Sequence, residues 1–274
     1  MAAKDTESTE TDLPGMLAVA VDAVKAAEEV FLDRIGAPPS VAKGEHDFAT
    51  QADLDIESLL RVRLAATGIP VLGEEGGGDV HTERTWVVDP IDGTANYSVG
   101  NPMAAILVSL LVHGQPVVAV TSIPVVGRRL AVTEGGPITV NGEEITPDPN
   151  PDAIPAQVGF SSVASPSGSE FTSHFRQNLL AELASTFLRP RITGSVGVDL
   201  AFAATGTFGG ALSLSPHPWD NAAGVLLARA AGRRVTDIHG EEWTPDSRGV
   251  VAGAPASHEA ILTTIARVRE RGGR

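Results

Sequence analysis

Three short acidic segments hold the residues that are best suited to chemistry. They are Gly73-Glu74-Glu75, the central run Asp89-Pro90-Ile91-Asp92-Gly93-Thr94, and Trp219-Asp220. Each segment is expected where a strand ends or a helix begins, and strand ends in layered α/β folds converge on one edge of a sheet. Carboxylates that are distant in sequence can then share a cation, and Mg²⁺ prefers oxygen ligands. The pattern therefore predicts a site for hard divalent ions.

The central run has a spacing that suits both a metal and an anion. Pro90 restricts the backbone after Asp89, so that Asp89 and Asp92 can face one point. The Ile91 carbonyl then stays available as a neutral oxygen ligand. Gly93 admits close backbone approach, and a helix or turn that begins there would offer free N–H groups to a phosphate.

Each segment also has an ordinary structural interpretation. Asp-Pro-x-Asp-Gly is by itself a turn signature, because Pro presets φ and Gly accepts a positive φ. Glu74-Glu75 before three glycines is typical of a solvated loop, and Asp220 alone would be the N-cap of the following helix. Only the combination of the three segments favours metal chemistry.

Composition and missing motifs narrow the function classes. The 274 residues include no Cys, which excludes disulfides, thiolate zinc sites, iron–sulfur clusters and thiol catalysis. A net charge of −14 argues against a nucleic-acid partner. No His pair has zinc-site spacing, and neither a Gly-x-Ser-x-Gly elbow nor a Walker loop occurs. No apolar stretch is long enough to span a bilayer and no basic–apolar leader is present, so a cytoplasmic protein without a membrane partner is expected.

Apolar periodicity predicts the elements that position these carboxylates. The polar, acidic stretch 1–15 is expected to be a disordered tail. One helix is expected over 16–35 and another over 53–68. Short buried strands and an antiparallel meander then follow, at 71–72, 86–88, 104–112, 116–123, 128–133 and 138–145.

The Pro- and Asp-rich run 146–155 is the expected seam between two subdomains. An N-terminal α+β subdomain, 16–146, would carry most metal ligands, and a C-terminal α/β subdomain, 147–274, would complete the site. Strands and helices alternate in the second subdomain, which is typical of a layered α/β architecture. They are expected near 156–160, 171–185, 198–204, 210–214, 222–231, 234–237, 249–252 and 258–269.

The order and spacing of these motifs resemble those of the inositol monophosphatase family. The matching runs are 73–75, 86–97 and 219–224, with 47–53 upstream and 194–195 downstream. The resemblance covers about residues 16–270, and the chain looks most like the actinobacterial members. It implies an α+β fold of the layered αβαβα sandwich type, shared with fructose-1,6-bisphosphatase. It also implies a homodimer, two to three Mg²⁺ ions per subunit, and inhibition by Li⁺.

The resemblance assigns the metal ligands by position. Glu74, Asp89 and the Ile91 backbone carbonyl would hold the first ion. Asp89, Asp92 and Asp220 would hold the second ion, so that Asp89 bridges the two. Metals so held would activate a water molecule and stabilise the leaving alkoxide, so no nucleophilic side chain is needed.

The resemblance also assigns catalytic and substrate-binding residues. Asp53 and Thr94, with Glu74, would position the attacking water. The backbone N–H groups of Gly93 and Thr94 would receive the phosphate. The implied substrate-binding residues are Gly93, Thr94, Gly194, Ser195, Asp199 and Ser213.

Ser213 departs from the family pattern. Many members place a glutamate seven residues before the aspartate of the Trp-Asp pair, where it accepts hydrogen bonds from inositol hydroxyls. Losing such a bond costs about 1.5–3 kcal/mol of discrimination. The predicted reaction is the Mg²⁺-dependent hydrolysis of myo-inositol 1-phosphate to inositol and phosphate. Fructose 1,6-bisphosphate, histidinol phosphate and 3′-phosphoadenosine 5′-phosphate are the alternative substrates, and a non-catalytic metal-binding regulatory protein is the alternative of another class.

Overall fold

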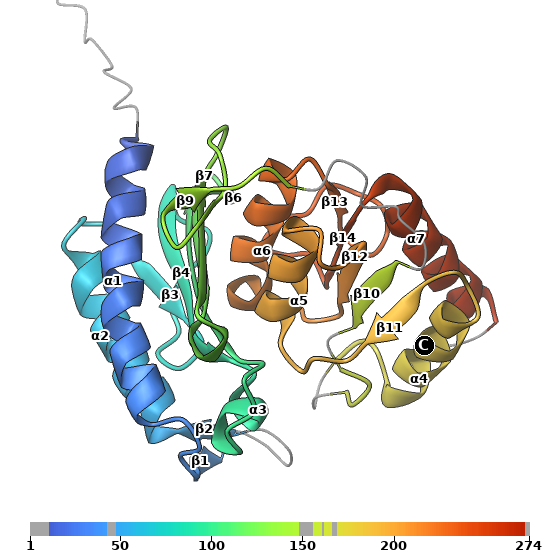
Figure 1. Ribbon diagram of the computed structural model, residues 1–274, viewed down its shortest axis with the longest axis horizontal. Helices are drawn as coiled ribbons and strands as arrows, with labels where there is room; N and C mark the ends of the chain where they lie inside the picture. Colours follow the sequence, from blue (N-terminus) through green and yellow to red (C-terminus); the bar gives the residue numbers. More distant parts are fainter. Residues whose placement is uncertain (1–10, 43–47, 148–155, 161, 166–168, 272–274) are drawn as a thin grey trace, which may run out of the picture.

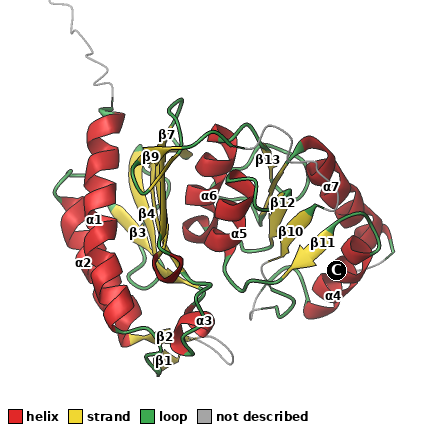
Figure 2. Cartoon of the chain, in the orientation of Figure 1, coloured by secondary structure: helices red, strands yellow, loops and turns green. Residues whose placement is uncertain are grey.

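The computed structural model describes residues 11–42, 48–147, 156–160, 162–165 and 169–271. They form five layers in the order helices, sheet, helices, sheet, helices (Figure 1). The strands of the two sheets stand between the helical layers (Figure 2). The predicted layered αβαβα sandwich is therefore confirmed.

Helix α1 (Leu13–Asp33) forms part of the first outer layer. It begins inside the stretch 1–15 that the sequence predicted to be a tail, so that prediction was wrong for its last residues. The Asp12 carboxylate accepts a hydrogen bond from the Gly15 N–H at 3.0 Å, and Pro14 stands in the first turn, where its missing N–H costs nothing. Residues 1–10 of the predicted tail lie outside the described residues.

A two-stranded hairpin precedes the second outer helix. Strands β1 (Pro39–Ala42) and β2 (Phe48–Thr50) pair antiparallel, and residues 43–47 between them lie outside the described residues. Helix α2 (Gln51–Ala65) begins directly after β2 and lies beside α1 (Figure 1). Thr50 caps this helix, which fixes the place of its first turn.

The seven-stranded sheet has its strands in chain order, β3 to β9. Strands β3 and β4 are parallel and all later neighbours are antiparallel, so the predicted meander is confirmed. A bulge separates Asp89 from Asp92 in β4, and the short helix α3 (Thr94–Ser98) follows. A 3₁₀ turn (Pro124–Val126) joins β6 to β7. The strands are β3 (Val71–Gly73), β4 (Arg84–Asp92), β5 (Ala105–Val112), β6 (Gln115–Ile123), β7 (Arg128–Thr133), β8 (Thr139–Val140) and β9 (Glu143–Glu144).

The five-stranded sheet has the order β11-β10-β12-β14-β13. Strand β10 is parallel to β11 and β12, whereas β14 is antiparallel to both of its neighbours. Strand β11 was not predicted, because its Arg-Pro-Arg sequence has no apolar pattern. The strands are β10 (Gln157–Phe160), β11 (Arg189–Arg191), β12 (Gly210–Ser213), β13 (Arg234–Thr236) and β14 (Val250–Gly253).

Helices α5 (Val196–Ala204) and α6 (Pro218–Ala230) form the middle layer and contact strands of both sheets. They pack closely, because a Cβ added to Gly224 of α6 would lie 2.4 Å from the Leu200 Cβ of α5. Helices α4 (Ser173–Ala184) and α7 (Pro255–Glu270) cover the far face of the five-stranded sheet (Figure 1). Residues 148–155 of the expected seam lie outside the described residues, so the division into two subdomains stays a prediction.

Candidate active site

A cavity of about 250 Å³ opens where β3, β4, α3 and α6 meet. It brings together all five predicted metal-ligand residues with Gly93, Thr94 and Gly194. Among the described residues, its lining consists of Phe48, Glu74, Asp89, Ile91, Asp92, Gly93, Thr94, Ala95, Gly194 and Asp220.

Asp89 lies at the bulge of β4 and is only 2% exposed. Its Oδ1 accepts a hydrogen bond from the Ile91 N–H at 3.0 Å, which turns the backbone after Pro90. Burial raises the pKa of Asp89 well above its usual range, and the nearby charges of Glu74 and Asp92 raise it further. The site therefore favours either a proton or a cation at this carboxylate.

Asp92 is held by the first turn of α5. The Ser195 hydroxyl and the Gly197 N–H donate to its Oδ2, the latter at 2.6 Å, and the Val196 N–H donates to its Oδ1 at 3.2 Å. Burial raises the pKa of Asp92 to about 6, although these hydrogen bonds lower it. A Cβ on Gly197 would lie 2.9 Å from the Asp92 Oδ2 and 2.4 Å from the Leu107 Cδ2, so the approach of α5 depends on glycine.

Asp220 enters the cavity from the first turn of α6. The helix begins at Pro218 and its N-cap is His217, so the interpretation of Asp220 as the N-cap was wrong. Burial raises the pKa of Asp220 well above its usual range, the charges of Asp92 and Glu74 add to this effect, and a hydrogen bond with Ser215 opposes it. Asp220 is therefore electrostatically coupled to the carboxylates of the seven-stranded sheet.

This donor set fits a hard divalent cation in type and charge. Four carboxylates and one carbonyl supply only oxygen atoms, which Mg²⁺ prefers, and a cation would relieve the mutual repulsion of the acids. Within the described part of the chain, no three acidic or imidazole groups lie at metal-binding spacing. Both oxygens of Asp92 accept hydrogen bonds from α5, and the side chains of Asp89 and Asp220 share a hydrogen bond.

Thr94 and Asp53 form a hydrogen-bonded pair at the edge of the cavity. The Thr94 hydroxyl lies 3.2 Å from the Asp53 Oδ1 and 3.0 Å from the Ile91 carbonyl oxygen, so its one proton is shared between two acceptors. Asp53 is fully buried, and its Oδ2 accepts from the N–H and the hydroxyl of Thr50 at 2.8 and 2.6 Å. The capping box of α2 thus fixes Asp53 against Thr94.

Two glycines and an asparagine lie on the α3 side of the cavity. Gly93 and Gly194 have φ values of 90° and 82°, which favour glycine. The Asn96 amide donates to the carbonyl oxygens of Met103 and Thr193 at 2.6 and 2.8 Å, and so ties α3 to the turn before α5. Sequence reasoning did not assign a role to Asn96, although it lies within the matching run 86–97.

Three predicted substrate contacts lie behind the cavity wall. Ser195, Asp199 and Ser213 are each 1% exposed and are not among the described lining residues. The Asp199 Oδ1 accepts from the Thr193 hydroxyl at 2.8 Å, and its Oδ2 has no hydrogen-bond partner in the described part of the chain. The Ser213 hydroxyl accepts from the Ser215 N–H at 3.1 Å. Ser195 contacts a lining residue directly, because its hydroxyl donates to the Asp92 Oδ2.

Comparison with known proteins shows the family of the chain. Residues 12–270 match the sequence pattern of the inositol monophosphatase family. The chain belongs to the inositol monophosphatase family. The inositol-1-monophosphatase ImpA of Mycolicibacterium smegmatis is 42% identical over 255 residues, which are 92% of each chain. The probable inositol 1-monophosphatase ImpA of Mycobacterium tuberculosis is 43% identical over 247 residues, 89% of this chain and 92% of the relative.

A solved structure supports the fold of this family member. IMPase from Thermotoga maritima superposes with a TM-score of 0.83 at 22% identity, over 94% of this chain and 99% of that one. Family membership confirms the predicted enzyme class, a phosphatase, and implies metal-dependent catalysis on a small phosphorylated substrate. None of the helices in the described residues is long and apolar enough to cross a membrane.

Proposed function

We propose that the chain hydrolyses phosphomonoesters with Mg²⁺, and that myo-inositol 1-phosphate is among its substrates. The observation that supports this most is the convergence of four carboxylates and the Ile91 carbonyl on one cavity beside the Thr94–Asp53 pair. The names of the two mycobacterial relatives support the choice of substrate. Glu74, Asp89 and the Ile91 carbonyl would hold one ion.

Asp89, Asp92 and Asp220 would hold a second Mg²⁺ ion, with two to three ions per subunit in all. When bound, Mg²⁺ supplies charge that stabilises the phosphoryl oxygens and the leaving alkoxide and lowers the pKa of water. The first turn of α5 keeps Asp92 oriented through Ser195 and Gly197.

The residues of the chain then position the reactants. The Thr94 hydroxyl accepts a hydrogen bond from the attacking water while it donates to Asp53, which stays fixed by Thr50. The N–H groups of Gly93 and Thr94 receive the phosphate. Glu74 lies on the same cavity and joins in orienting the water. Gly194 lines the cavity, while Ser195, Asp199 and Ser213 shape the leaving-group side from behind.

Assembly, location and inhibition remain predictions from the sequence and the family resemblance. A homodimer in the cytoplasm, inhibited by Li⁺, is expected. Gel filtration with light scattering tests whether the chain forms a homodimer. Titration of the phosphatase activity with Li⁺ tests the inhibition.

Phosphate release from a panel of phosphoesters tests the proposed function. The panel contains inositol 1-phosphate, fructose 1,6-bisphosphate, histidinol phosphate and 3′-phosphoadenosine 5′-phosphate, each assayed with Mg²⁺ and with EDTA. EDTA should abolish release, and Asp89→Asn should lower kcat/KM by roughly 10²-fold or more. Release that persists in EDTA would contradict the mechanism, whereas Mg²⁺ binding without turnover of any substrate would favour the non-catalytic regulatory alternative.

A further inference from the structure

Glu57 is a buried carboxylate of α2 that lies outside the active-site cavity. Its side chain is 3% exposed, and it is not among the described residues that line the cavity. Asp53, which holds Thr94, lies four residues earlier and therefore on the same face of the helix. A carboxylate is rarely buried unless hydrogen bonds satisfy its oxygens. The partners of Glu57 therefore show what this side chain does.

These partners are backbone N–H groups of the loop that carries Glu74. The Glu57 Oε2 accepts from the Glu75 N–H at 2.7 Å, and its Oε1 accepts from the Gly76 N–H at 2.8 Å. Gly73 and Gly77 close the loop, because they exchange two backbone hydrogen bonds at 3.0 and 3.1 Å. Glu57 thus holds the backbone that directly follows a proposed metal ligand.

Arg61 completes the contact from the next turn of α2. Its Nε donates to the Glu57 Oε1 at 2.7 Å, and its Nη1 and Nη2 donate to the carbonyl oxygens of Val71 and Gly77 at 2.9 and 2.6 Å. The fixed fork of a guanidinium suits three such acceptors. The Glu57–Arg61 pair therefore joins α2 to the strand before Glu74 and to the turn after it.

Two glycines allow the loop to lie directly on the Glu57–Arg61 pair. A Cβ on Gly73 would lie 2.5 Å from the Glu57 Cδ, and a Cβ on Gly76 would lie 2.7 Å from the Glu57 Oε1 and 2.8 Å from the Arg61 Nη2. Neither glycine has a positive φ, so close approach is the reason for glycine at both positions. The loop is in tight contact with Glu57 on both sides of Glu74.

We propose that Glu57 is a positioning residue, which orients the loop that carries Glu74 and thereby sets the affinity for the Mg²⁺ ion that Glu74 would hold. The inference rests on the proposed function and adds a residue of α2 to it. Removing a group that orients a metal ligand typically weakens metal affinity by about 10- to 100-fold. Because Glu57 acts through Glu74, its loss should be overcome by a high Mg²⁺ concentration.

Two substitutions disturb this contact from opposite sides. Glu57→Gln keeps the size of the side chain but leaves one acceptor oxygen for the two N–H groups of the loop. We expect it to weaken Mg²⁺ binding, measured by calorimetry, by about 10- to 100-fold, with little change in kcat at saturating Mg²⁺. Gly76→Ala crowds the same contact and should weaken the binding similarly. The double variant should lose less affinity than the product of the two single losses, because both act on one contact.

Amide hydrogen exchange in EDTA measures the order of the loop without metal or turnover. In Glu57→Gln the amides of Glu75 and Gly76 should exchange roughly tenfold faster or more, whereas those of α1 should be unchanged. Gly76→Ala should also speed the exchange of the Glu75 amide. If Glu57→Gln does not fold, Gly76→Ala decides the inference by the same two measurements.

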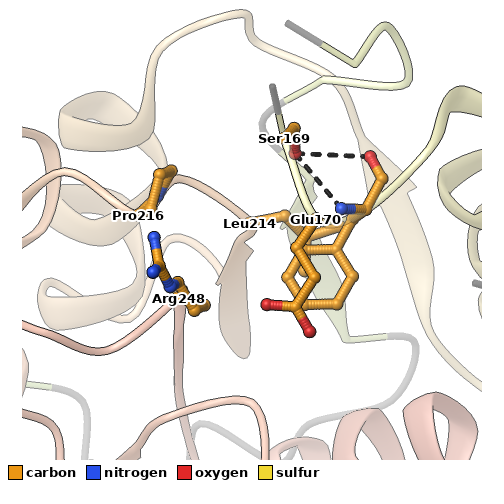
Figure 3. Close-up of a pocket in the computed structure, with 6 residues that line it drawn as sticks. Ser169, Glu170, Leu214, Pro216 and Arg248 are labelled. Atoms are coloured by element: carbon orange, nitrogen blue, oxygen red, sulfur yellow. Dashed lines mark hydrogen bonds between the residues drawn. The ribbon is translucent and has the colours of Figure 1, made fainter. Parts of the chain in front are cut away.

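Two control variants separate positioning from loss of charge and loss of stability. Glu170→Gln makes the same substitution at an exposed glutamate, which Figure 3 shows beside Leu214 in another cavity, of about 180 Å³, that shares no described lining residue with the active-site cavity. Ile56→Val removes one methyl group from the core next to Glu57 in α2 and should lower stability. Both controls should leave Mg²⁺ affinity and the exchange of the loop unchanged.

Unchanged Mg²⁺ affinity in Glu57→Gln would overturn the inference, whatever the exchange of the loop. Weakened affinity with unchanged exchange, or an equal loss of affinity in Ile56→Val, would overturn it as well. If the unaltered chain neither binds Mg²⁺ nor releases phosphate with it, the proposed function itself is contradicted, and the inference falls with it.

Discussion

The hydroxyl of Thr94 has one proton and two acceptors, Asp53 and the Ile91 carbonyl. Its role in orienting water can be separated from its role in packing by two substitutions. Thr94→Val removes the hydroxyl and keeps the shape, so we expect kcat to fall roughly 10²- to 10³-fold with little change in thermal stability. Thr94→Ser keeps the hydroxyl and should retain most activity. Equal losses of kcat in steady-state assays of the two variants would contradict this role.

Asp199 is a buried acid whose Oδ2 has no partner in the described part of the chain. Burial raises the pKa of Asp199 well above its usual range, and the hydrogen bond from Thr193 opposes this only in part. The folded state therefore binds a proton that the unfolded state releases, and this carboxyl destabilises the fold as pH rises above its ordinary pKa.

Asp199→Asn removes this ionisation while keeping the size of the side chain. We expect the free energy of unfolding at pH 8 to rise by about 1–3 kcal/mol relative to the unaltered chain, and the gain to shrink towards pH 4. Urea unfolding of both proteins at pH 8 and at pH 4 measures this difference in the free energy of unfolding. A gain that is independent of pH would mean that the benefit does not come from the charge.

At the scale of elements, the middle layer couples packing to the site. Gly197 brings the first turn of α5 against Asp92 and Leu107, and Gly224 brings α6 against Leu200. Both Gly197→Ala and Gly224→Ala place a Cβ 2.4 Å from a leucine carbon, so each should destabilise the fold by about 1–3 kcal/mol. Only the former crowds a proposed metal ligand.

Mg²⁺ titration of these two variants distinguishes crowding at Asp92 from general destabilisation. Gly197→Ala should weaken the apparent Mg²⁺ affinity by roughly 10- to 100-fold, whereas Gly224→Ala should change it much less. Equal losses of affinity would indicate that α5 orients Asp92 only through overall stability.

Most elements could be predicted from the sequence because their apolar spacing is local. The meander from Ala105 to Thr133 is an example, and helix α6 was also predicted, although over 222–231 rather than from Pro218. The hairpin formed by β1 and β2 was missed, because its strands are only four and three residues long and β1 is exposed along its whole length, so neither has an alternating apolar pattern. The hydrogen bonds from the first turn of α5 to Asp92 could not be predicted, because Ser195 is 103 residues from Asp92 and its N-cap role in α5 does not reveal a second partner. The predicted substrate contacts Asp199 and Ser213 rest on sequence position alone, which does not show that both side chains are buried and lie outside the described lining of the cavity.

For the whole molecule, the cluster of acids makes stability depend on pH and metal together. The raised pKa values of Asp89, Asp92 and Asp220 mean that the folded, metal-free chain binds more protons than the unfolded chain above about pH 4. Its stability should therefore fall as pH rises through about 6, where Asp92 ionises. Mg²⁺ binds the ionised carboxylates, so its stabilising effect should grow over the same range.

Thermal unfolding in EDTA and in MgCl₂ at pH 5 and pH 8 measures both effects. At a Mg²⁺ concentration of 100 times Kd, the added stability is about 2.7 kcal/mol, or an increase in Tm of roughly 5–10 °C at pH 8. The increase should be much smaller at pH 5. Asp220→Asn should reduce it at pH 8, and an increase that is the same at both pH values would contradict the linkage.

Because α5 and α6 lie between the two sheets, the active site can form only late in translation. Glu74, Asp89 and Asp92 leave the ribosome about 100 to 150 residues before Ser195 and Asp220, so the early part of the chain carries repelling acids without the helices α5 and α6. Catalytic competence can arise only after the last third of the polypeptide has been synthesised and has docked on the earlier sheet. The onset of phosphatase activity after dilution from denaturant should consequently report the final docking event, later than the recovery of helical and sheet content.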